Sequence, residues 1–326
     1  MADATTSATT SATTGVESVP SGRVRIPYDP ALLAPLPVGL PVEVYDGTGA
    51  PPTEHDGVAF YVLPYTFDRA PLRLLADMPD LRVVQALTAG YEHVLPYLPS
   101  GAVLANGRGI HEASTAELAV TLMLASLRGV PEFVRGQDAG EWRAGFYPAL
   151  ADRTVLIVGY GAIGQAVERR LAGFEVDVVR VARSARTTAG GEPVRAIAEL
   201  PELLPAADVV VLTTPLDADT RGLVDEAFLA RMRDGALLVN VARGPVVDTE
   251  ALLAAVRTGR VTAALDVTDP EPLPADHPLR HAPGVLISPH VGGSSSAFLP
   301  RALRLIRRQI TAWAAGRPID NVVAGW

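Results

Sequence analysis

Two amino-acid types are absent from this sequence, and each absence excludes a class of chemistry. The chain of 326 residues contains no cysteine, so disulfide bonds and thiol catalysis are excluded. It also contains no lysine, because all 28 of its basic residues are arginine. Schiff-base formation and general-base catalysis by lysine are therefore excluded as well.

Acidic residues outnumber basic ones, and the sequence has no long apolar run. The 36 acidic residues give a formal net charge of −8, which argues against nucleic acid as the main partner, since phosphate binding needs a basic face. The most apolar stretch, Leu118–Leu127, is shorter than the roughly 20 residues of a membrane-spanning helix. We therefore expect neither a nucleic-acid nor a membrane partner.

The N-terminus carries no sign of a targeting signal. Residues 1–15 are a tract of Thr, Ser and Ala with nothing large to bury, so we expect a disordered tail. The first arginine is Arg23, and no apolar segment precedes it, which is not the form of a secretory signal. The expected location is the cytoplasm.

What is present indicates a globular α/β protein. The sequence is 48% hydrophobic and 20% charged, which is ordinary for that class, and it is long enough for two domains. A strongly apolar segment predicts a helix over Ser114–Leu127, with Ser114 as its N-cap and Glu117 completing a capping box. Before it, apolar runs between prolines predict strands over Val42–Tyr45, Val58–Leu63, Leu81–Leu87 and Val103–Ala105.

From residue 154 onward, apolar strands and helices alternate regularly. Runs such as 209–212 (VVVL) suit strands that are covered on both faces, so the pattern predicts a doubly wound parallel sheet. The expected strands are Thr154–Val158, Val176–Ala182, Asp208–Thr213, Ala236–Val241, Val261–Asp266 and Val285–Ser288. The expected helices are Ala162–Ala172, Ile197–Leu204, Glu226–Met232, Thr249–Thr258 and Ala297–Ala314.

A G-x-G-x-x-G motif follows the first strand of this region. Gly159 permits a tight turn, Gly161 lets the backbone approach a pyrophosphate, and Gly164 lets the helix pack on the strand. The helix N-terminus offers free N–H groups to the phosphates. Because strand, motif, helix and second strand occur in order, we interpret the motif as a dinucleotide site and not as a structural glycine turn.

The end of the second strand indicates which dinucleotide binds. Ala182 stands where an acidic residue would hold the ribose 2′-hydroxyl of NAD. Arg183, Ser184 and Arg186 follow it, and guanidinium groups match a 2′-phosphate. NADP(H) is therefore the expected cofactor, with NAD(H) as a second one that the site could accept. The alternative is a solvated, arginine-rich loop.

Three later segments place polar residues at the ends of expected strands: 239–248 (NVARG at its centre), 264–273 (DPEP) and 287–293 (SPHVGG). Together these segments resemble the D-isomer-specific 2-hydroxyacid dehydrogenases. The resemblance, which covers the chain from about residue 55, implies that Arg243, Glu271 and His290 are catalytic. It further implies cofactor contacts from Tyr160, Ala162, Ile163, Thr214, Pro215, Val241, Asp266, His290, Gly292 and Gly293.

The chemistry of a 2-keto acid suits the three implied catalytic residues. Arg243 can bind the carboxylate and polarise the neighbouring carbonyl as hydride arrives. His290 can supply the proton that the developing alkoxide needs. Glu271 would fix the orientation of the imidazole ring and favour its charged form.

The segment 87–92 (LTAGYE) resembles the carboxylate-binding loop of the same family. There the backbone N–H groups of Ala89, Gly90 and Tyr91 would hold the substrate acid, and the alternative is an ordinary glycine turn. This loop and Arg108 depart from the commoner versions of the family, which leaves the size of the substrate open. Three tyrosines could line an aromatic-tolerant pocket or simply pack in the core: Tyr61, Tyr65 and Tyr91.

Two relatives with other substrates fit the sequence less well. Phosphite dehydrogenases use a lysine on this loop, and formate dehydrogenases carry glutamine where Glu271 stands. NADPH preference favours the reductive direction and a likeness to glyoxylate/hydroxypyruvate reductases. The alternative from another class is a dinucleotide-sensing scaffold similar to the C-terminal-binding corepressors.

The resemblance implies two Rossmann-like doubly wound domains, with the nucleotide-binding domain inserted into a flavodoxin-like substrate domain. We expect residues 16–104 and 292–326 to form the substrate domain and residues 105–291 the dinucleotide-binding domain. A homodimer through the latter is expected, with contacts from the 114–127 helix and Trp142. No metal site is expected, and surface or packing roles are expected for His55, His93, His111, His277 and His281.

Overall fold

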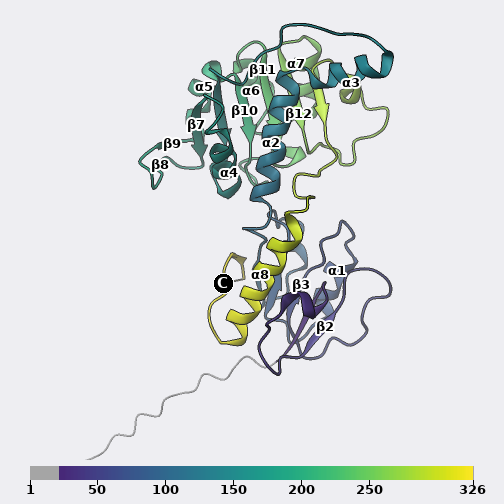
Figure 1. Ribbon diagram of the computed structural model, residues 1–326. Coiled ribbons are helices and arrows are strands. Elements are labelled where there is room, and N and C mark those ends of the chain that lie inside the picture. The colour runs from purple at the N-terminus through teal and green to yellow at the C-terminus, as the bar shows by residue number, and fades with distance from the viewer. Residues whose placement is uncertain (1–21, 326) are drawn as a thin grey trace, which may run out of the picture.

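The computed structural model describes residues 22–325, so the predicted tail at residues 1–15 lies outside the described residues. The described chain forms two lobes that meet at a narrow waist (Figure 1). Among these residues, no helix combines the length and the apolar character that crossing a membrane requires.

The lower lobe of Figure 1 is built on a six-stranded sheet of order β14-β5-β4-β3-β1-β2. The strands β1 to β5 are parallel and follow the 2-1-3-4-5 order of flavodoxin-like folds, whereas β14 is antiparallel to β5. Its elements are β1 (Arg23–Ile26), β2 (Val42–Val44), β3 (Val58–Val62), α1 (Ala70–Arg73), β4 (Val83–Gln85), β5 (Val103–Ala105), α8 (Phe298–Ala314) and β14 (Val322–Ala324).

The upper lobe is an eight-stranded sheet of order β13-β12-β11-β10-β6-β7-β9-β8, parallel except for β8. The central order is that of a Rossmann fold, and the order reverses between β6 and β10, where such sheets bind their ligands. Its strands are β6 (Thr154–Val158), β7 (Asp177–Ala182), β8 (Arg186–Thr187), β9 (Pro193–Ala196), β10 (Val209–Leu212), β11 (Ala236–Asn240), β12 (Val261–Leu265) and β13 (Val285–Ile287).

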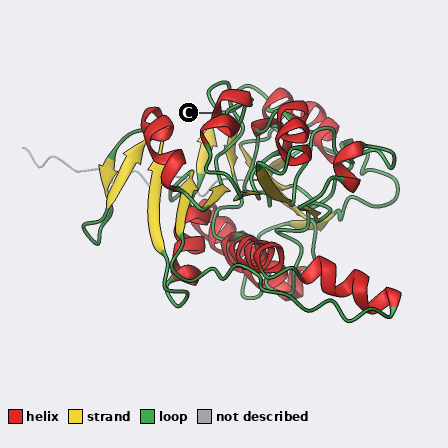
Figure 2. Ribbon diagram, turned by 90° about the horizontal axis from the view of Figure 1, so that it is seen from above, coloured by secondary structure: helices red, strands yellow, loops and turns green. Residues whose placement is uncertain are grey.

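Helices cover both faces of the upper sheet, as the view from above shows (Figure 2). In β10, Val210 and Leu212 belong to one apolar core, and Val209 and Val211 belong to the other. The uninterrupted VVVL run is therefore explained by burial on two faces. The helices are α2 (Glu112–Leu127), α3 (Val130–Ala139), α4 (Ala162–Leu171), α5 (Leu200–Leu203), α6 (Glu226–Arg231) and α7 (Thr249–Arg257).

The predicted fold class is confirmed: two doubly wound domains, of which one is inserted into the other. The chain leaves the lower sheet after β5, builds the whole upper sheet, and returns to the lower lobe in α8. The helix α8 packs on that lobe through Ala302, Ile306 and Trp313. On this basis we propose 16–104 with 292–326, and 105–291, as the two domains.

The predicted start of α2 is wrong. The helix begins at Glu112, after His111 at the N-cap position, so Ser114 lies inside the first turn. The Ser114 side chain is buried and bonds the Ser295 hydroxyl at 2.6 Å. Glu112 instead accepts a hydrogen bond from the Gly109 N–H group. Ser114 thus forms a contact between two segments that are far apart in the sequence. Local capping rules cannot predict such a contact.

Other differences have local causes. The expected helix 197–204 is broken into short turns around α5, because Pro201 and Pro205 lack the N–H groups that a continuous helix needs. The strands β1, β8, β9 and β14 were not predicted, since each is short and lies beside prolines or charged residues. The helix α3 was not predicted either.

Candidate active site

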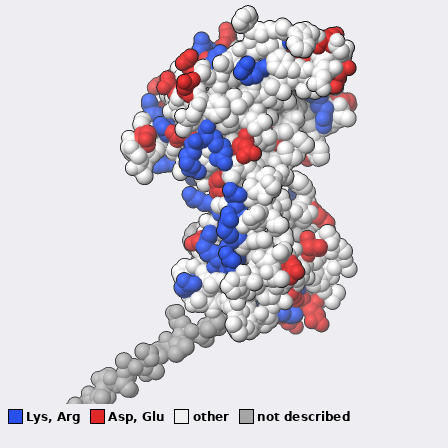
Figure 3. All heavy atoms as spheres, in the orientation of Figure 1, with Lys and Arg blue, Asp and Glu red and all other residues white. Residues whose placement is uncertain are grey.

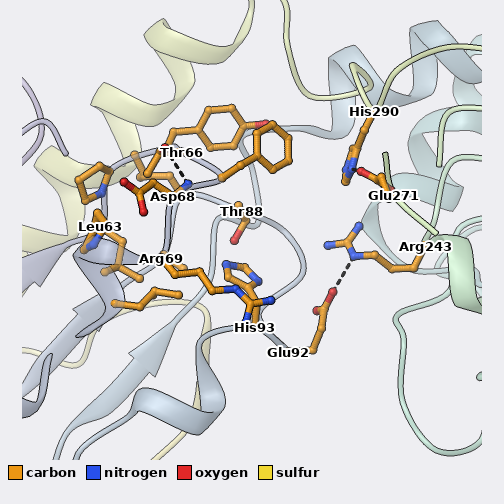
Figure 4. Close-up of a pocket in the computed structure, with 17 residues that line it drawn as sticks. Leu63, Thr66, Asp68, Arg69, Thr88, Glu92, His93, Arg243, Glu271 and His290 are labelled. Atoms are coloured by element: carbon orange, nitrogen blue, oxygen red, sulfur yellow. Dashed lines mark hydrogen bonds and ion pairs between the residues drawn. The ribbon is translucent and has the colours of Figure 1, made fainter. Parts of the chain in front are cut away.

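The three implied catalytic residues come from the carboxyl ends of neighbouring strands. Arg243 follows β11, Glu271 follows β12, and His290 follows β13. Their side chains face the loops of the lower lobe across a pocket of about 320 Å³. Figure 4 shows them on one side, and Thr88, Glu92, His93 and Arg69 on the other. The fold therefore joins groups that lie far apart in the sequence.

His290 and Glu271 form an ion-pair contact between Nδ1 and Oε1. Both side chains are about one-third exposed, so the pair lies at the pocket wall and not in the core. With the carboxylate accepting from Nδ1–H, the Nε2 atom of the ring is left for proton transfer. This is the orientation that an acid–base histidine requires.

The backbone around His290 is held by Asp266. His290 has a φ of 51°, a left-handed conformation that is uncommon for residues other than glycine. The buried Asp266 carboxylate accepts hydrogen bonds from the Ser288 hydroxyl (2.6 Å) and from the N–H groups of Val291 and Gly292 (2.9 and 2.8 Å). Asp266, predicted as a cofactor contact, thus also fixes the loop that carries His290.

Arg243 is held from two sides. Its Nε donates to Glu92 at 2.6 Å, and one terminal nitrogen donates to the Ala242 carbonyl at 2.8 Å. The other terminal nitrogen lies against Gly90, where an added Cβ atom would overlap it. Gly90 is therefore required for the close approach of the loop to the guanidinium group.

Glu92 is a functional candidate that the sequence analysis missed. Burial alone would raise its pKa, but the charge of Arg243 and the hydrogen bond from it outweigh burial and lower the pKa. Glu92 therefore stays ionised near neutrality and occupies one edge of the arginine. No sequence motif indicated this contact, because the two residues are 151 positions apart.

The loop at 88–91 has bonded carbonyl groups and free N–H groups. Its carbonyls are occupied: the Thr88 hydroxyl donates to Gly90 O, and the Asn106 amide donates to Ala89 O. The N–H groups of Ala89, Gly90 and Tyr91 donate to no acceptor within the part of the chain that the structure describes. Such a row of free donors suits an anion.

The tyrosines divide between pocket and core. Tyr65 lines the pocket. Tyr61 is buried in the lower core, and Tyr91 packs against the same core. The aromatic-tolerant wall is thus limited to Tyr65 and to Phe67, whose ring meets the His290 ring edge-on at 5.9 Å.

The glycine turn has the geometry of a phosphate cradle. Gly159 has a φ of 105°, and a Cβ atom there would lie 2.5 Å from Thr214 N. A Cβ atom on Gly164 would lie 2.6 Å from Gly159 O, whereas Gly161 faces open space. The buried Thr214 hydroxyl has no partner among residues 22–325. A tight turn, an open position and an unpartnered hydroxyl fit a bound dinucleotide.

The three residues predicted to bind a 2′-phosphate follow the second strand of the upper sheet. Arg186 donates to the Tyr160 carbonyl at 2.7 Å, which places its guanidinium group over the glycine turn. Arg183 is largely exposed and pairs with Asp217 at 2.8 Å. Ser184 is exposed between them. Asp217, which no sequence motif indicated, forms an ion pair with Arg183 and so partly neutralises its charge.

A second, smaller pocket of about 70 Å³ joins the glycine turn to the catalytic residues. It lies where a nicotinamide ring would reach His290 and Arg243. Of the predicted cofactor contacts, Pro215 does not line it and is exposed, and Ala162 only begins α4. Those that do line it are Ile163, Val241, Asp266, His290, Gly292 and Gly293.

Two of the histidines expected at the surface or in packing also line a pocket: His93 is exposed, and His111 is buried with its ring stacked on Tyr65 and Phe298. His93 lines the larger pocket. His111 lines the smaller one and donates from Nε2 to Leu87 O at 2.7 Å, which leaves a buried Nδ1 without a partner among the described residues. By contrast, His55 bonds the buried Arg25, and His277 caps a short turn.

The fold and the site together define a class of protein. A Rossmann sheet with its glycine turn binds a dinucleotide, and the adjacent histidine–carboxylate pair shares a pocket with an arginine that lies against a loop with free N–H groups. These are the parts of a dinucleotide-dependent oxidoreductase that acts on small acids.

Comparisons with known proteins give the family. The model of the D-isomer specific 2-hydroxyacid dehydrogenase NAD binding domain matches residues 120–292. The glyoxylate reductase/hydroxypyruvate reductase of Mus musculus is 35% identical over 240 residues, which cover 70% of this chain and 73% of that protein. The chain belongs to the D-isomer specific 2-hydroxyacid dehydrogenase family, and it is an NAD(P)-dependent oxidoreductase of 2-keto and 2-hydroxy acids.

Two solved structures share the whole architecture. One is the NADPH-dependent glyoxylate/hydroxypyruvate reductase of Sinorhizobium meliloti in complex with NADP and sulfate, at 28% identity and a TM-score of 0.79, covering 94% of this chain and 100% of that one. The other is a D-isomer specific 2-hydroxyacid dehydrogenase of Xanthobacter autotrophicus in complex with NADPH and MES, at 28% identity and a TM-score of 0.78, covering 94% and 99%.

Proposed function

We propose that this chain is an NADPH-dependent reductase of 2-keto acids, in which Arg243, Glu271 and His290 carry out the chemistry. The observation that supports it most strongly is a single pocket. The His290–Glu271 pair and Arg243 line it, and Arg243 also lies against Gly90 in the loop that carries the free N–H groups of residues 89–91. A small acid with a neighbouring carbonyl fits that arrangement of donors.

The substrate carboxylate would lie between the 89–91 N–H groups and Arg243. Because Glu92 and the Ala242 carbonyl occupy two nitrogens of the guanidinium group, the terminal nitrogen beside Gly90 remains for the substrate. A hydrogen bond from it polarises the keto oxygen and stabilises the negative charge that develops there. Bound NADPH supplies the hydride.

Proton transfer falls to His290. Its Nε2 donates a proton to the developing alkoxide, while Glu271 on Nδ1 stabilises the positive ring. In reduction the histidine must start protonated, and in oxidation it must start neutral. Reduction therefore slows as pH rises, and oxidation slows as pH falls.

Several features support NADP(H) over NAD(H). Position 182 is alanine, so no carboxylate there opposes a 2′-phosphate, and Arg183, Ser184 and Arg186 lie close together beyond it. Arginine side chains gather around α4 and along α8 on one face of the molecule (Figure 3), although the chain is acidic overall. The two related structures hold NADP or NADPH.

The direct test is turnover with glyoxylate and hydroxypyruvate. We expect NADPH-dependent reduction, with kcat/KM for NADPH well above that for NADH. His290→Asn is the control, because asparagine tolerates the left-handed backbone of this position but cannot transfer the proton. We expect its rate to fall by about 10²–10⁴-fold.

Each result bears on a different part of the proposal. A clear preference for NADH would contradict the role of Arg183 and Arg186. Wild-type turnover no faster than that of His290→Asn would contradict the reductase function and favour the dinucleotide-sensing scaffold.

We further propose a homodimer, formed by α3 and the loop that follows it. This arm, residues 130–149, stands away from the upper lobe (Figure 1). Trp142 is 96% exposed, and Phe133, Val134 and Phe146 are exposed as well. A monomer rarely exposes so many large apolar side chains together. The helix α2, also expected at the contact, packs on α4 and the sheet within the chain. The cytoplasmic location stays a prediction.

A further inference from the structure

The larger pocket extends past the catalytic residues into the lower lobe. Its volume of about 320 Å³ leaves room for several water molecules beside a two-carbon acid. Part of the pocket wall is apolar and is formed by the buried residues Leu63, Leu72 and Leu87. A substrate that fills this space carries a side chain.

The wall opposite the catalytic residues carries an exposed cation that forms no ion pair within the described residues. Within the described residues, Arg243 pairs with Glu92, and Glu271 pairs with His290. The Asp68 carboxylate accepts the Ala70 N–H group at 2.9 Å. Among residues 22–325, no carboxylate forms an ion pair with Arg69, the remaining cation of this pocket.

His93 lies beside Arg69 and adds a neutral hydrogen-bonding group. Figure 4 shows the two side chains together, across the pocket from His290. Burial lowers the pKa of His93, and the positive charges of Arg243 and Arg69 lower it further, against the opposing effect of Glu92. Near neutral pH the ring is therefore uncharged and can donate one hydrogen bond.

We propose that Arg69, with His93, binds a second acidic group of the substrate. The substrate class is then a 2-keto acid whose short apolar chain ends in a carboxylate or a similar anion. This inference rests on the proposed function, since it names the substrate of the same site. An unpaired guanidinium group in a partly apolar pocket favours an anion over a hydrocarbon chain, because the hydrocarbon would cover the charge without pairing it.

The test compares two substrates of nearly the same shape. In 5-methyl-2-oxohexanoate, two methyl groups replace the terminal carboxylate oxygens of 2-oxoglutarate. We expect the wild-type enzyme to favour 2-oxoglutarate in kcat/KM, with glyoxylate as the internal reference. In Arg69→Gln the preference should fall about 10-fold or more, mainly through KM. Arg73→Gln is the matched control, because it removes a charge from the same helix outside the pocket and should leave the preference unchanged.

The outcomes separate this inference from the proposed function. If the wild-type enzyme reduces glyoxylate but uses the uncharged analogue as well as 2-oxoglutarate, the second-acid site is wrong and an apolar or aromatic side chain is the substrate class. An unchanged preference in Arg69→Gln also overturns it. If glyoxylate is not reduced, the proposed function fails. In that case, tighter binding of glutarate than of 5-methylhexanoate, lost in Arg69→Gln, would still support the anion site.

Discussion

At the scale of single residues, this site depends on the close approach of the Gly90 backbone to the guanidinium group of Arg243. Gly90 touches the guanidinium group of Arg243, and the free N–H groups of residues 89–91 flank that contact. The arginine comes from the upper lobe and the glycine from the lower one. Substrate binding therefore requires that the position beside Arg243 carries no side chain.

We predict that Gly90→Ala lowers kcat/KM for the 2-keto acid by about 100-fold or more, because a displacement of about 1 Å in a reacting group has that effect. The global fold should persist, since Gly90 lies in a loop without positive φ. Steady-state kinetics with circular dichroism as the folding check would measure this. Gly173→Ala, at a position without positive φ and with no neighbouring atom within 4 Å, is the control for a general glycine effect. Activity near the wild-type level would show that Arg243 does not act from this position.

The Glu92–Arg243 pair predicts a dependence of stability on pH. The pKa of Glu92 is lower in the folded protein than in the unfolded chain. Its contribution to stability is therefore fully present above the unfolded pKa of about 4.3, and it is lost as pH falls through the lower, folded pKa. Because the side chains are partly exposed, we expect the contribution to be about 1 kcal/mol or less.

Urea unfolding of the wild-type protein and of Glu92→Gln would test this. The difference in unfolding free energy should be present at pH 7 and should shrink below about pH 4. Glu117→Gln, on the exposed side of α2, should show no such trend. A difference that grows toward low pH would contradict the assigned ion pair.

At the scale of elements, the arm of residues 130–149 exposes large apolar side chains that the described chain does not cover. Gly129 and Gly140 both adopt left-handed conformations at the ends of α3. The Phe133 and Tyr147 rings meet edge-on at 5.0 Å, so the loop folds back on the helix. The arm is thus an ordered element with an exposed apolar surface.

We predict that replacing Trp142 and Phe146 together by serine converts the dimer to a monomer. A stable interface buries about 1,200–2,000 Å² in total, and these two exposed rings supply a large apolar part of this surface. Analytical ultracentrifugation would measure the change. Val38→Ser, a fully exposed apolar position in the lower lobe, is the control. A dimer that survives the double substitution would place the interface elsewhere.

At the scale of the whole molecule, the two lobes meet around the cofactor site. The contacts between them are short polar ones, such as Ser114 to Ser295 and Thr115 to the Gly292 carbonyl. The larger pocket is lined by both lobes. A cofactor that bridges the waist therefore stabilises the relative position of the lobes as well as the upper domain.

We predict that NADPH at about 100 times its Kd raises Tm by about 5–10 °C, since this saturation adds about 2.7 kcal/mol. NADH at the same concentration should give a smaller shift. Arg186→Gln should reduce the difference between the two cofactors, because Arg186 lies over the glycine turn. Differential scanning fluorimetry would measure these shifts in Tm. Equal shifts for NADH and NADPH in the wild-type protein would contradict the assigned 2′-phosphate site.

The sequence by itself determined the parts of this protein that depend on local order. The strand, glycine turn and helix at 154–171 are fixed by apolar periodicity and by the backbone freedom of Gly159. The run at 209–212 requires burial on both faces, which only a covered parallel sheet provides. The family motifs gave Arg243, Glu271 and His290 because each follows a recognisable strand.

The tertiary structure decided which side chains meet. Glu92 bonds Arg243, which lies 151 positions away in the sequence. Asp266 accepts hydrogen bonds from the loop that carries His290. Ser114, predicted as a helix N-cap, instead bonds Ser295. None of these contacts has a sequence period or a short motif, because each depends on how two separately folded sheets are placed. No sequence motif predicted that Arg69 and His93 would line the same pocket either. The sequence determined that hydride chemistry on an acid takes place here, and the packing of the lobes decided the shape and charge of the space beside it.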